Sequence, residues 1–115
     1  MVIKNENQNI EVKIKMREGK GEAIIKNIID SNKLSHSRLF STITLKQGCS
    51  IGKHTHIQET EYYYILSGEG IVTEADGEKF VKPGDVVVTG DQESHSIINN
   101  RKEDLVFIAL ILLND

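Results

Sequence analysis

The sequence has 115 residues, the length of one ordinary domain. Its 14 lysine and arginine residues against 17 aspartate and glutamate residues give a formal net charge of −3. The chain therefore lacks the basic excess that neutralises nucleic-acid phosphates. Its single cysteine, Cys49, excludes an intramolecular disulfide and a zinc site built from several thiolates.

Neither end of the sequence shows a targeting or membrane-spanning segment. Residues 1–10 lack the apolar core of a signal peptide. The longest apolar run, Leu105–Leu113, is about half as long as a membrane-spanning helix needs to be. We expect a soluble, cytoplasmic protein with neither a membrane nor a nucleic acid as partner. Residues 1–115 are expected to form a single domain, with residues 1–15 as a loosely held N-terminal arm.

The segment 21–34 allows two interpretations. Its isoleucines Ile24, Ile25, Ile28 and Ile29 recur with a spacing that suits an amphipathic helix of three turns. They are β-branched, however, and a helix would stand alone in this chain. We interpret the segment as a strand and keep the helix as the alternative.

From residue 39 onward the sequence predicts short strands separated by turns. Asp76-Gly77 predicts a two-residue hairpin turn of type I′, and Pro83-Gly84-Asp85 predicts a further turn. Many short strands with closely spaced turns indicate an all-β sandwich or barrel. The expected strands are Leu39–Leu45, Tyr62–Leu66, Ile71–Ala75, Glu78–Val81, Val86–Thr89, Ser96–Ile98 and Leu105–Leu113.

Side chains that bind metals gather between residues 54 and 61. His54 and His56 are two apart, which on an extended segment places both imidazoles on one face. Glu61 opens the next expected strand and can return to the same point, and His95 lies near the start of a later strand. Three imidazoles and a carboxylate suit one divalent ion (Mn, Fe, Co, Ni or Zn) and leave positions for a ligand. Taken singly, such histidines are more often surface or hydrogen-bonded core residues, and Glu59 and Glu61 would be exposed charges.

The spacing of these residues resembles the cupin superfamily. Its first motif, G-x5-H-x-H-x4-E-x6-G, is matched at every fixed position, by Gly48, His54, His56, Glu61 and Gly68. Its second motif, G-x5-P-x-G-x2-H-x3-N, is matched by Gly84, His95 and Asn99. Gly90 replaces the usual proline and Gln92 the usual glycine, so we expect an altered turn before the His95 strand.

The resemblance implies a double-stranded β-helix, or jelly roll, of two packed antiparallel sheets. It also implies one metal ion held by His54, His56, Glu61 and His95. The chain is similar to small cupins of the oxalate-decarboxylase-like group. Oxalate decarboxylases commonly carry an arginine three residues before the first metal histidine, where this chain has Ile51.

Three further residues are candidates for the site. Counting by two from Glu61 and from His95 places Tyr63 and Asn99 on the ligand face. Tyr63 is the candidate catalytic residue, as a donor of a hydrogen bond or proton near the ion, with packing in the sheet as the alternative. Arg38 and Asn99 are the candidate substrate-binding residues. Arg38 could pair with a carboxylate, and its alternative is a solvated strand end.

The predicted function is that of a metal-dependent enzyme acting on a small carboxylate or other oxygen-rich substrate, of decarboxylase, dioxygenase or isomerase type. The alternatives are a non-catalytic cupin that binds the metal or a small ligand, as a sensor or accessory protein, and a barrel with a vestigial site. The run Leu105–Leu113 is apolar on both faces. We therefore expect part of it to lie in a homodimer interface or under the N-terminal arm.

Overall fold

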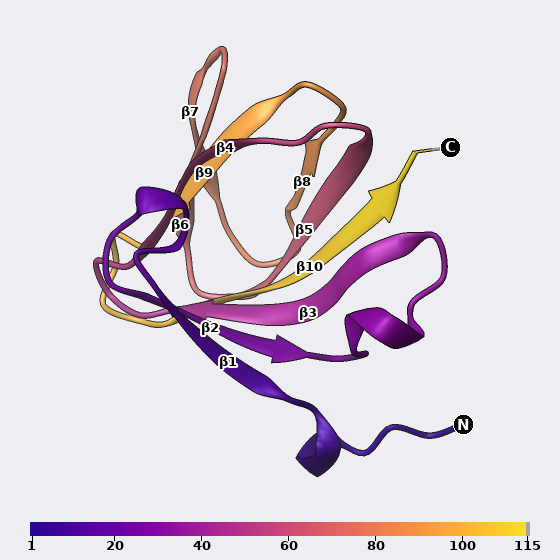
Figure 1. Cartoon of the computed structure of the whole chain (residues 1–115). Coiled ribbons are helices and arrows are strands. Elements are labelled where there is room, and N and C mark those ends of the chain that lie inside the picture. The colour runs from indigo at the N-terminus through magenta and orange to yellow at the C-terminus, as the bar shows by residue number, and fades with distance from the viewer. Residues whose placement is uncertain (115) are drawn as a thin grey trace.

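The computed structural model describes residues 1–114, which form two antiparallel sheets (Figure 1). This confirms the predicted all-β fold. No helix among these residues is long and apolar enough to cross a membrane. The six-stranded sheet has the order β1 (Ile10–Ile14), β2 (Glu22–Asn27), β3 (Ser37–Leu45), β10 (Leu105–Leu113), β5 (Glu59–Ser67) and β8 (Val86–Thr89). The four-stranded sheet has the order β4 (Ser50–Thr55), β9 (Ser94–Ile98), β6 (Gly70–Glu74) and β7 (Gly77–Val81). Three short 3-10 turns are η1 (Asn5–Asn7), η2 (Met16–Glu18) and η3 (Ser31–Lys33).

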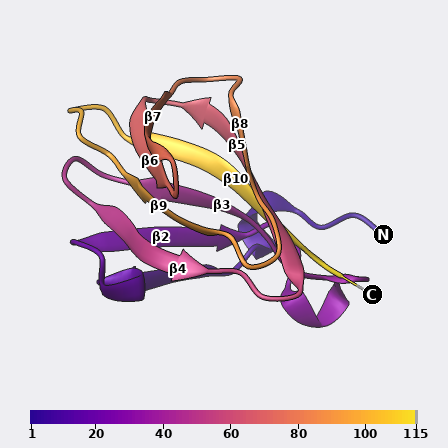
Figure 2. The ribbon, with the colours of Figure 1, turned by 90° about the horizontal axis from the view of Figure 1, so that it is seen from above.

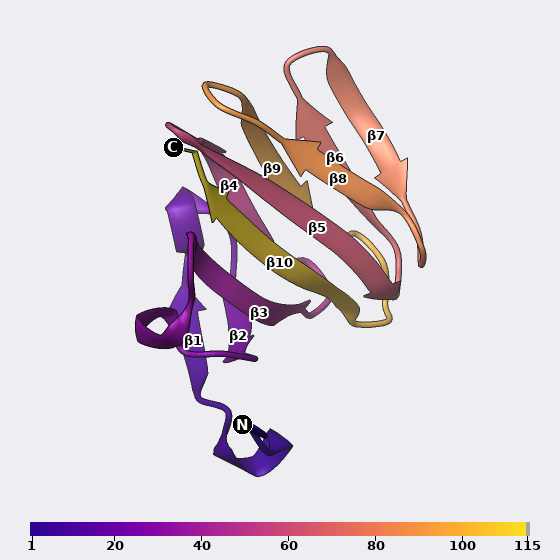
Figure 3. The same ribbon diagram turned by 90° about the vertical axis from the view of Figure 1, so that its right-hand side faces the viewer.

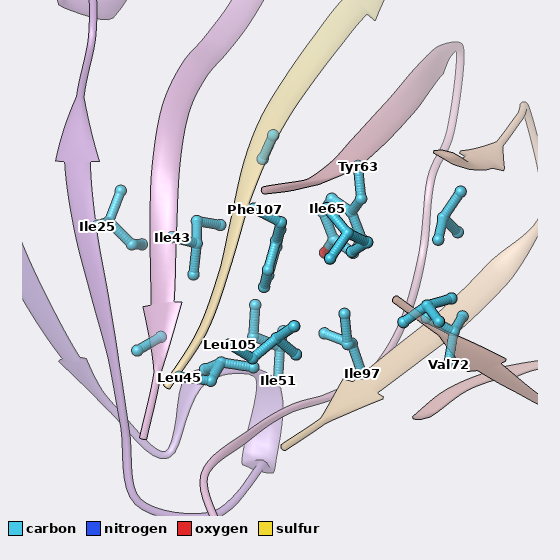
Figure 4. Close-up of a cluster of buried hydrophobic side chains, with 14 residues drawn as sticks. Ile25, Ile43, Leu45, Ile51, Tyr63, Ile65, Val72, Ile97, Leu105 and Phe107 are labelled. Atoms are coloured by element: carbon cyan, nitrogen blue, oxygen red, sulfur yellow. The ribbon is translucent and has the colours of Figure 1, made fainter. Parts of the chain in front are cut away.

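The hydrophobic core lies where the inner faces of the two sheets meet (Figure 4). Ile43 and Phe107 point inward from β3 and β10, and Ile51 and Ile97 point inward from β4 and β9. Buried and more exposed positions alternate along most strands, as expected when one face of a strand packs on a core. This core fixes the strands that carry the candidate ligands.

β10 is a central strand of the six-stranded sheet, between β3 and β5 (Figure 3). Leu105 and Phe107 face the core, whereas Val106 and Ile108 alternate with them and are half-buried on the outer face. The apolar run therefore serves both faces of one strand, as the sequence predicts.

The segment 21–34 contains a strand, β2, so the helical alternative is wrong. Ala23 and Ile25 are buried on the inner face, while Ile24 between them is half-buried on the other. Burial thus follows the two-residue period of a strand. The rest of the segment is a loop that includes η3.

Part of the expected N-terminal arm, residues 10–14, is the strand β1. It pairs with β2 at the edge of the sheet, where Val12 lies opposite Ile24. Because β2 and β3 separate β1 from β10, residues 10–14 extend the sheet and do not cover the outer face of β10. The expectation that the arm covers Leu105–Leu113 is therefore wrong for this strand.

The hairpin of β6 and β7 is confirmed, but its turn comes one residue earlier than predicted. Glu74 pairs with Gly77, so Ala75 and Asp76 are the two loop residues. Neither has a positive φ, whereas a type I′ turn needs positive φ at both. Gly77, with φ of 122°, takes the conformation that only glycine adopts freely.

Candidate metal centre

Three imidazoles and one carboxylate converge between the two sheets. His54 lies on β4 and His56 directly after it, while His95 lies on β9 opposite His54. Glu61 reaches the same point from β5 in the other sheet. The structure thus brings together the four residues that the sequence predicts as ligands.

The four candidate ligand atoms lie within 4.8 Å of one another. His95 Nε2 is 3.0 Å from His54 Nε2 and 3.1 Å from His56 Nε2. Glu61 Oε1 is 3.0 Å from Nε2 of both His56 and His95, and 3.9 Å from that of His54. One ion at the centre of this group is in reach of all four atoms.

Hydrogen bonds on the outer side of two rings determine which nitrogen faces the centre. His54 Nδ1 donates to the Gly52 carbonyl oxygen at 2.8 Å, and His56 Nδ1 donates to the Glu59 carboxylate at 2.5 Å. These oxygens accept hydrogen bonds only, so both rings carry a proton on Nδ1 and direct the Nε2 lone pair inward when neutral. Metal-ligating histidines are oriented by outer contacts of this kind.

Lone pairs converge at the centre of the group. Glu61 Oε1 is buried and has no hydrogen-bond partner among the described residues. His95 has its Nδ1 2.7 Å from Thr89 Oγ1, which leaves Nε2 for the centre. A buried carboxylate oxygen without a partner is unfavourable, and inward lone pairs around it add repulsion. A divalent cation removes both penalties, so these residues fit a metal ion.

The pKa values of the ligand group follow from burial and from mutual contacts. Burial alone would raise the pKa of Glu61, but the three histidines around it lower that pKa far below its usual range. Burial lowers the pKa of His95. The contact with Glu61, ahead of the hydrogen bond with Glu59, raises the pKa of His56. A charged Glu61 and a neutral His95 are the forms that bind a metal.

Glu59 links the ligand group to Arg38. The Arg38 guanidinium donates two hydrogen bonds to the Glu59 carboxylate, at 2.6 and 2.7 Å, and the same carboxylate accepts from His56. The hydrogen bond from Arg38 is the main cause of the lowered pKa of Glu59. The interpretation of Glu59 as an exposed charge is wrong, because its side chain is buried. Its spacing of two from Glu61 is the signal that places both on one face of β5.

Arg38 reaches the pocket because β3 is irregular at this residue. β10 pairs Ile111 with Leu39 and Leu112 with Ser37, so Arg38 is the extra residue of a β-bulge. Both Arg38 and Leu39 line the pocket beside the ligand group, although they are neighbours in the sequence. In a regular strand, Arg38 and Leu39 would point to opposite faces. The bulge turns Arg38 inward, to the same side as Leu39.

Tyr63 packs directly against the ligand group. Its ring stacks on that of His95, with centroids 5.0 Å apart and planes 16° apart, and it also contacts Phe107. Burial, and then the charge of Glu61, raises the pKa of Tyr63 well above its usual value. Tyr63 therefore keeps its proton at neutral pH and can donate a hydrogen bond into the pocket that it lines.

Asn99 lies beyond the opposite end of β9 from His95, away from the ligand group. Its Nδ2 donates to the carbonyl oxygens of Leu45 and Glu103, each at 2.8 Å. Its Oδ1 accepts from the Arg101 N–H at 2.8 Å. Asn99, predicted as a substrate-binding residue, has its side chain engaged in anchoring the loop before β10.

The turn before β9 accommodates both departures from the second motif. Gln92 has a φ of 66°, the left-handed region that glycine adopts without strain, and its N–H donates to the His56 carbonyl oxygen. The Gly90 N–H donates to Glu93 Oε1 at 2.6 Å, a contact that proline cannot make. These contacts hold the turn in place, and His95 keeps its position.

A cavity of about 390 Å³ opens beside the ligand group. His54, His56 and Glu61 lie in its wall together with Tyr63 and Arg38. The remaining wall includes residues of β1 and of the η2 turn, which lies against β4 (Figures 1 and 2). The N-terminal segment is therefore part of the site.

Known proteins with similar sequences agree with this geometry. A family model described as the cupin domain matches residues 41–111, which contain all four candidate ligands. The chain belongs to the cupin family. An "Oxalate-binding protein" of Thermotoga maritima is 41% identical to this cupin over 99 residues, which are 85% of this chain and 82% of that protein.

Solved structures extend the similarity to the N-terminal strands. The crystal structure of a predicted oxalate decarboxylase from Thermotoga maritima has a TM-score of 0.92 and 38% identity, over 98% of this cupin and 99% of that chain. A putative sugar phosphate isomerase from Acidithiobacillus ferrooxidans shares the fold, with a TM-score of 0.82 and 24% identity over 99% of this cupin and 76% of that chain. The first similarity includes β1 and η2, which lie outside the family model.

Proposed function

We propose that this cupin binds one divalent transition metal through His54, His56, Glu61 and His95 and uses it to hold a small carboxylate of the oxalate kind. The observation that carries the proposal is the buried, unpartnered Oε1 of Glu61 among three inward-facing imidazole nitrogens beside a cavity. The metal, when bound, supplies a Lewis acid with positions open to ligand oxygens. The ion is Mn, Fe, Co, Ni or Zn, since each suits this donor set.

Two observations support a carboxylate as the ligand. The relative from Thermotoga maritima is described as an oxalate-binding protein. The cavity beside the ligand group is also lined by several cationic side chains, Arg38 among them. A small acid that is negatively charged at neutral pH matches both the metal and these cations.

The protein's own side chains have separate roles in this proposal. Glu59 holds the His56 ring in its inward orientation and is itself held by Arg38. Tyr63, which stays protonated, donates a hydrogen bond to an oxygen of the bound ligand. Arg38 attracts the substrate through its positive charge. Its two described hydrogen bonds both go to Glu59, so this role does not depend on a direct hydrogen bond to the substrate.

A second candidate function is catalysis of decarboxylase, dioxygenase or isomerase type. The buried Tyr63 hydroxyl beside the ligand group favours it, because such a group can deliver a proton to a reacting atom in the pocket. In this case Tyr63 is a catalytic residue, and Tyr63→Phe abolishes turnover while the ligand still binds. If the protein only binds the ligand, the ligand is recovered unchanged from both the wild type and Tyr63→Phe.

The test begins with elemental analysis of protein purified without a histidine tag. We expect about one equivalent of a divalent transition metal per chain, and oxalate binding by calorimetry that disappears when the metal is removed. Nuclear magnetic resonance of the recovered ligand then separates binding from catalysis. Protein that takes up no metal after refolding with Mn, Fe, Co, Ni or Zn, or that binds oxalate equally well without metal, contradicts the proposal.

We also propose that this cupin forms a homodimer through the outer face of its six-stranded sheet. Apolar side chains face outward on neighbouring strands, with Val12 opposite Ile24, Ile108 opposite Tyr64, and Tyr64 opposite Val86. The residues Val12, Tyr64 and Val86 are exposed in a single chain. An apolar face shared by several strands is typical of a surface that a second copy covers.

Sedimentation at micromolar concentration tests the dimer. The double variant Tyr64→Lys/Val86→Lys is expected to be monomeric, because two charges on the face oppose its burial. Phe80→Lys on β7 is the control, since Phe80 is also exposed and apolar but lies in the other sheet. A monomeric wild-type protein refutes the dimer.

A further inference from the structure

A group of three cationic side chains lies in the cavity wall that the N-terminal segment provides. Lys13 belongs to β1 and lies opposite the buried Ala23, which places it on the inner face of the sheet. Lys15 and Arg17 belong to the connection from β1 to β2 and line the same cavity. We refer to Lys13, Lys15 and Arg17 as the basic wall.

The basic wall has no carboxylate partners of its own. None of the ion pairs found among residues 1–114 involves Lys13, Lys15 or Arg17. Arg38, which lines the same cavity, is by contrast paired with the Glu59 carboxylate. Glu11 lines the same cavity but is in none of these ion pairs, so the charge of the basic wall is available to an anion there.

The backbone around Arg17 is held in an unfavourable conformation. Lys15, Arg17 and Glu18 have φ values of 52°, 55° and 63°, in the left-handed region that residues other than glycine seldom adopt. Three such residues in four positions persist only where the surroundings fix them. Strain of this kind is common at ligand-binding segments.

Two glycines allow the connection to press directly against β4. A Cβ added to Gly52 would collide with the carbonyl oxygen of Arg17, and one added to Gly19 would collide with the carbonyl oxygen of Ser50. The Ser50 N–H also donates to the Lys20 carbonyl oxygen at 2.9 Å. Because β4 continues to His54, these contacts tie the position of Arg17 to the strand that carries the first candidate ligand.

Arg17 lines the same cavity as the ligand group. His54, His56 and Glu61 lie in the wall of that cavity together with Tyr63, whose ring stacks on that of His95. A ligand that occupies this cavity beside the metal would therefore lie within reach of the charge of Arg17.

We propose that Arg17 determines the preference of this cupin for dicarboxylates, by binding the carboxylate that points away from the metal. The inference rests on the proposed metal-dependent binding of a carboxylate. Arg17 has the forked donor geometry that pairs with a carboxylate through two hydrogen bonds, which Lys13 and Lys15 lack. Arg38 already has one edge of its guanidinium engaged by Glu59.

Calorimetry on the metal-loaded protein tests the role of Arg17, with oxalate as the dicarboxylate and acetate as the monocarboxylate. Arg17→Gln is expected to weaken oxalate binding by roughly tenfold to a hundredfold and acetate binding by less than about threefold. Metal content, measured by elemental analysis, is expected to stay the same. Arg101→Gln is the matched control, because Arg101 lies over the Phe80 ring and does not line the cavity.

A second variant tests whether the strained connection positions Arg17. Gly19→Ala displaces the connection from β4 and is expected to reduce oxalate affinity while Arg17 is still present. Circular dichroism and metal content establish that the variant is folded and loaded. Gly77→Ala, which strains the backbone at a φ of 122° but leaves the connection against β4 in place, controls for a general loss of stability.

The outcomes separate the two proposals. If wild-type protein binds oxalate but Arg17→Gln binds it equally well, the role of Arg17 is overturned and the proposed function stands. If Arg17→Gln weakens acetate binding as much as oxalate binding, Arg17 does not bind the second carboxylate, and its proposed role is overturned. If metal-loaded wild-type protein binds no oxalate, both are overturned.

Discussion

The two ends of β9 bury polar side chains in opposite ways. At its beginning, His95 directs a nitrogen toward two other histidines and the unpartnered oxygen of Glu61. Just beyond its end, Asn99 is equally buried, but its amide makes three hydrogen bonds to backbone groups. About 13 Å of strand separates the two residues.

The hydrogen bonds of the two residues show which buried polar groups point to a function. Burial is the same for His95 and Asn99, so burial alone does not distinguish a ligand from an anchor. The hydrogen-bond balance does, because Asn99 is satisfied by the chain itself and the His95 group is completed only by a cation.

The largest effect is expected from removing two ligands at once. In His54→Ala/His95→Ala, metal content is expected to fall from about one equivalent per chain to background, since two of the four candidate donors are lost. Elemental analysis measures it, and circular dichroism monitors the fold. His36→Ala is the control, as His36 is the one histidine outside the group. A double variant that retains a full equivalent contradicts the site.

Acidification is expected to release the metal. The pKa of His56 is raised by its contact with Glu61, so a proton competes with the metal there at a higher pH than at an ordinary histidine. A proton competes less with the metal at His95, because burial lowers the pKa of His95. Below the pKa of His56, metal affinity falls roughly tenfold per pH unit for each proton displaced. Titration between pH 8 and pH 5 tests this, and an affinity independent of pH would refute it.

Removing the Asn99 amide is expected to act on stability and not on the metal. Asn99→Ala removes the side-chain partner of three backbone groups, one of them buried and two partly buried, which lowers the free energy of unfolding by about 2–4 kcal/mol. Thermal unfolding measures the loss, and elemental analysis is expected to find unchanged metal content. Asn100→Ala, at the exposed neighbouring position, is expected to stay within about 0.5 kcal/mol of the wild type. Loss of metal from Asn99→Ala would contradict the distinction between His95 as a ligand and Asn99 as a structural anchor.

The smallest effect is expected from changing a residue that only orients a ligand. Glu59→Gln keeps a hydrogen-bond acceptor for His56 but removes the negative charge of Glu59, which pairs with Arg38. Metal affinity is therefore expected to fall by about tenfold to a hundredfold. Competition with a chelator measures the affinity. Glu69→Gln, at an exposed carboxylate 3.8 Å from Arg101, is the control. An unchanged affinity would limit Glu59 to holding Arg38.

Local spacing predicts those parts of the site that a single strand determines. His54 and His56 follow from the two-residue period of an extended segment, and the motif spacing adds Glu61 and His95. Glu59 is two residues from Glu61 and shares its face of the strand, but the sequence does not show that Arg38 and His56 bury it. Neighbours from other strands decide whether a charged residue on an inner face is buried.

Other features depend on register between distant strands, which local patterns do not encode. The bulge that turns Arg38 inward arises where β3 and β10 pair, more than 60 residues apart in the sequence. The two-residue period places Asn99 on the same side as His95, but a period gives the face and not the distance to the ligand group, and Asn99 lies just beyond the far end of β9. β1 shows strand-like alternation from Ile10 to Ile14, and what makes it part of the site is its pairing with β2.

The central position of β10 has a consequence for how the chain matures. This strand is synthesised after every other strand described, yet β3 and β5 both pair with it and not with each other. Until residues 105–113 have left the ribosome, β3 and β5 each keep an open edge, and the strand with Glu61 has no fixed place relative to β3. Unpaired edges of this kind favour aggregation. We therefore expect a nascent chain stalled before residue 105 to be held by chaperones and unable to retain metal, which pull-down of stalled ribosomes can measure.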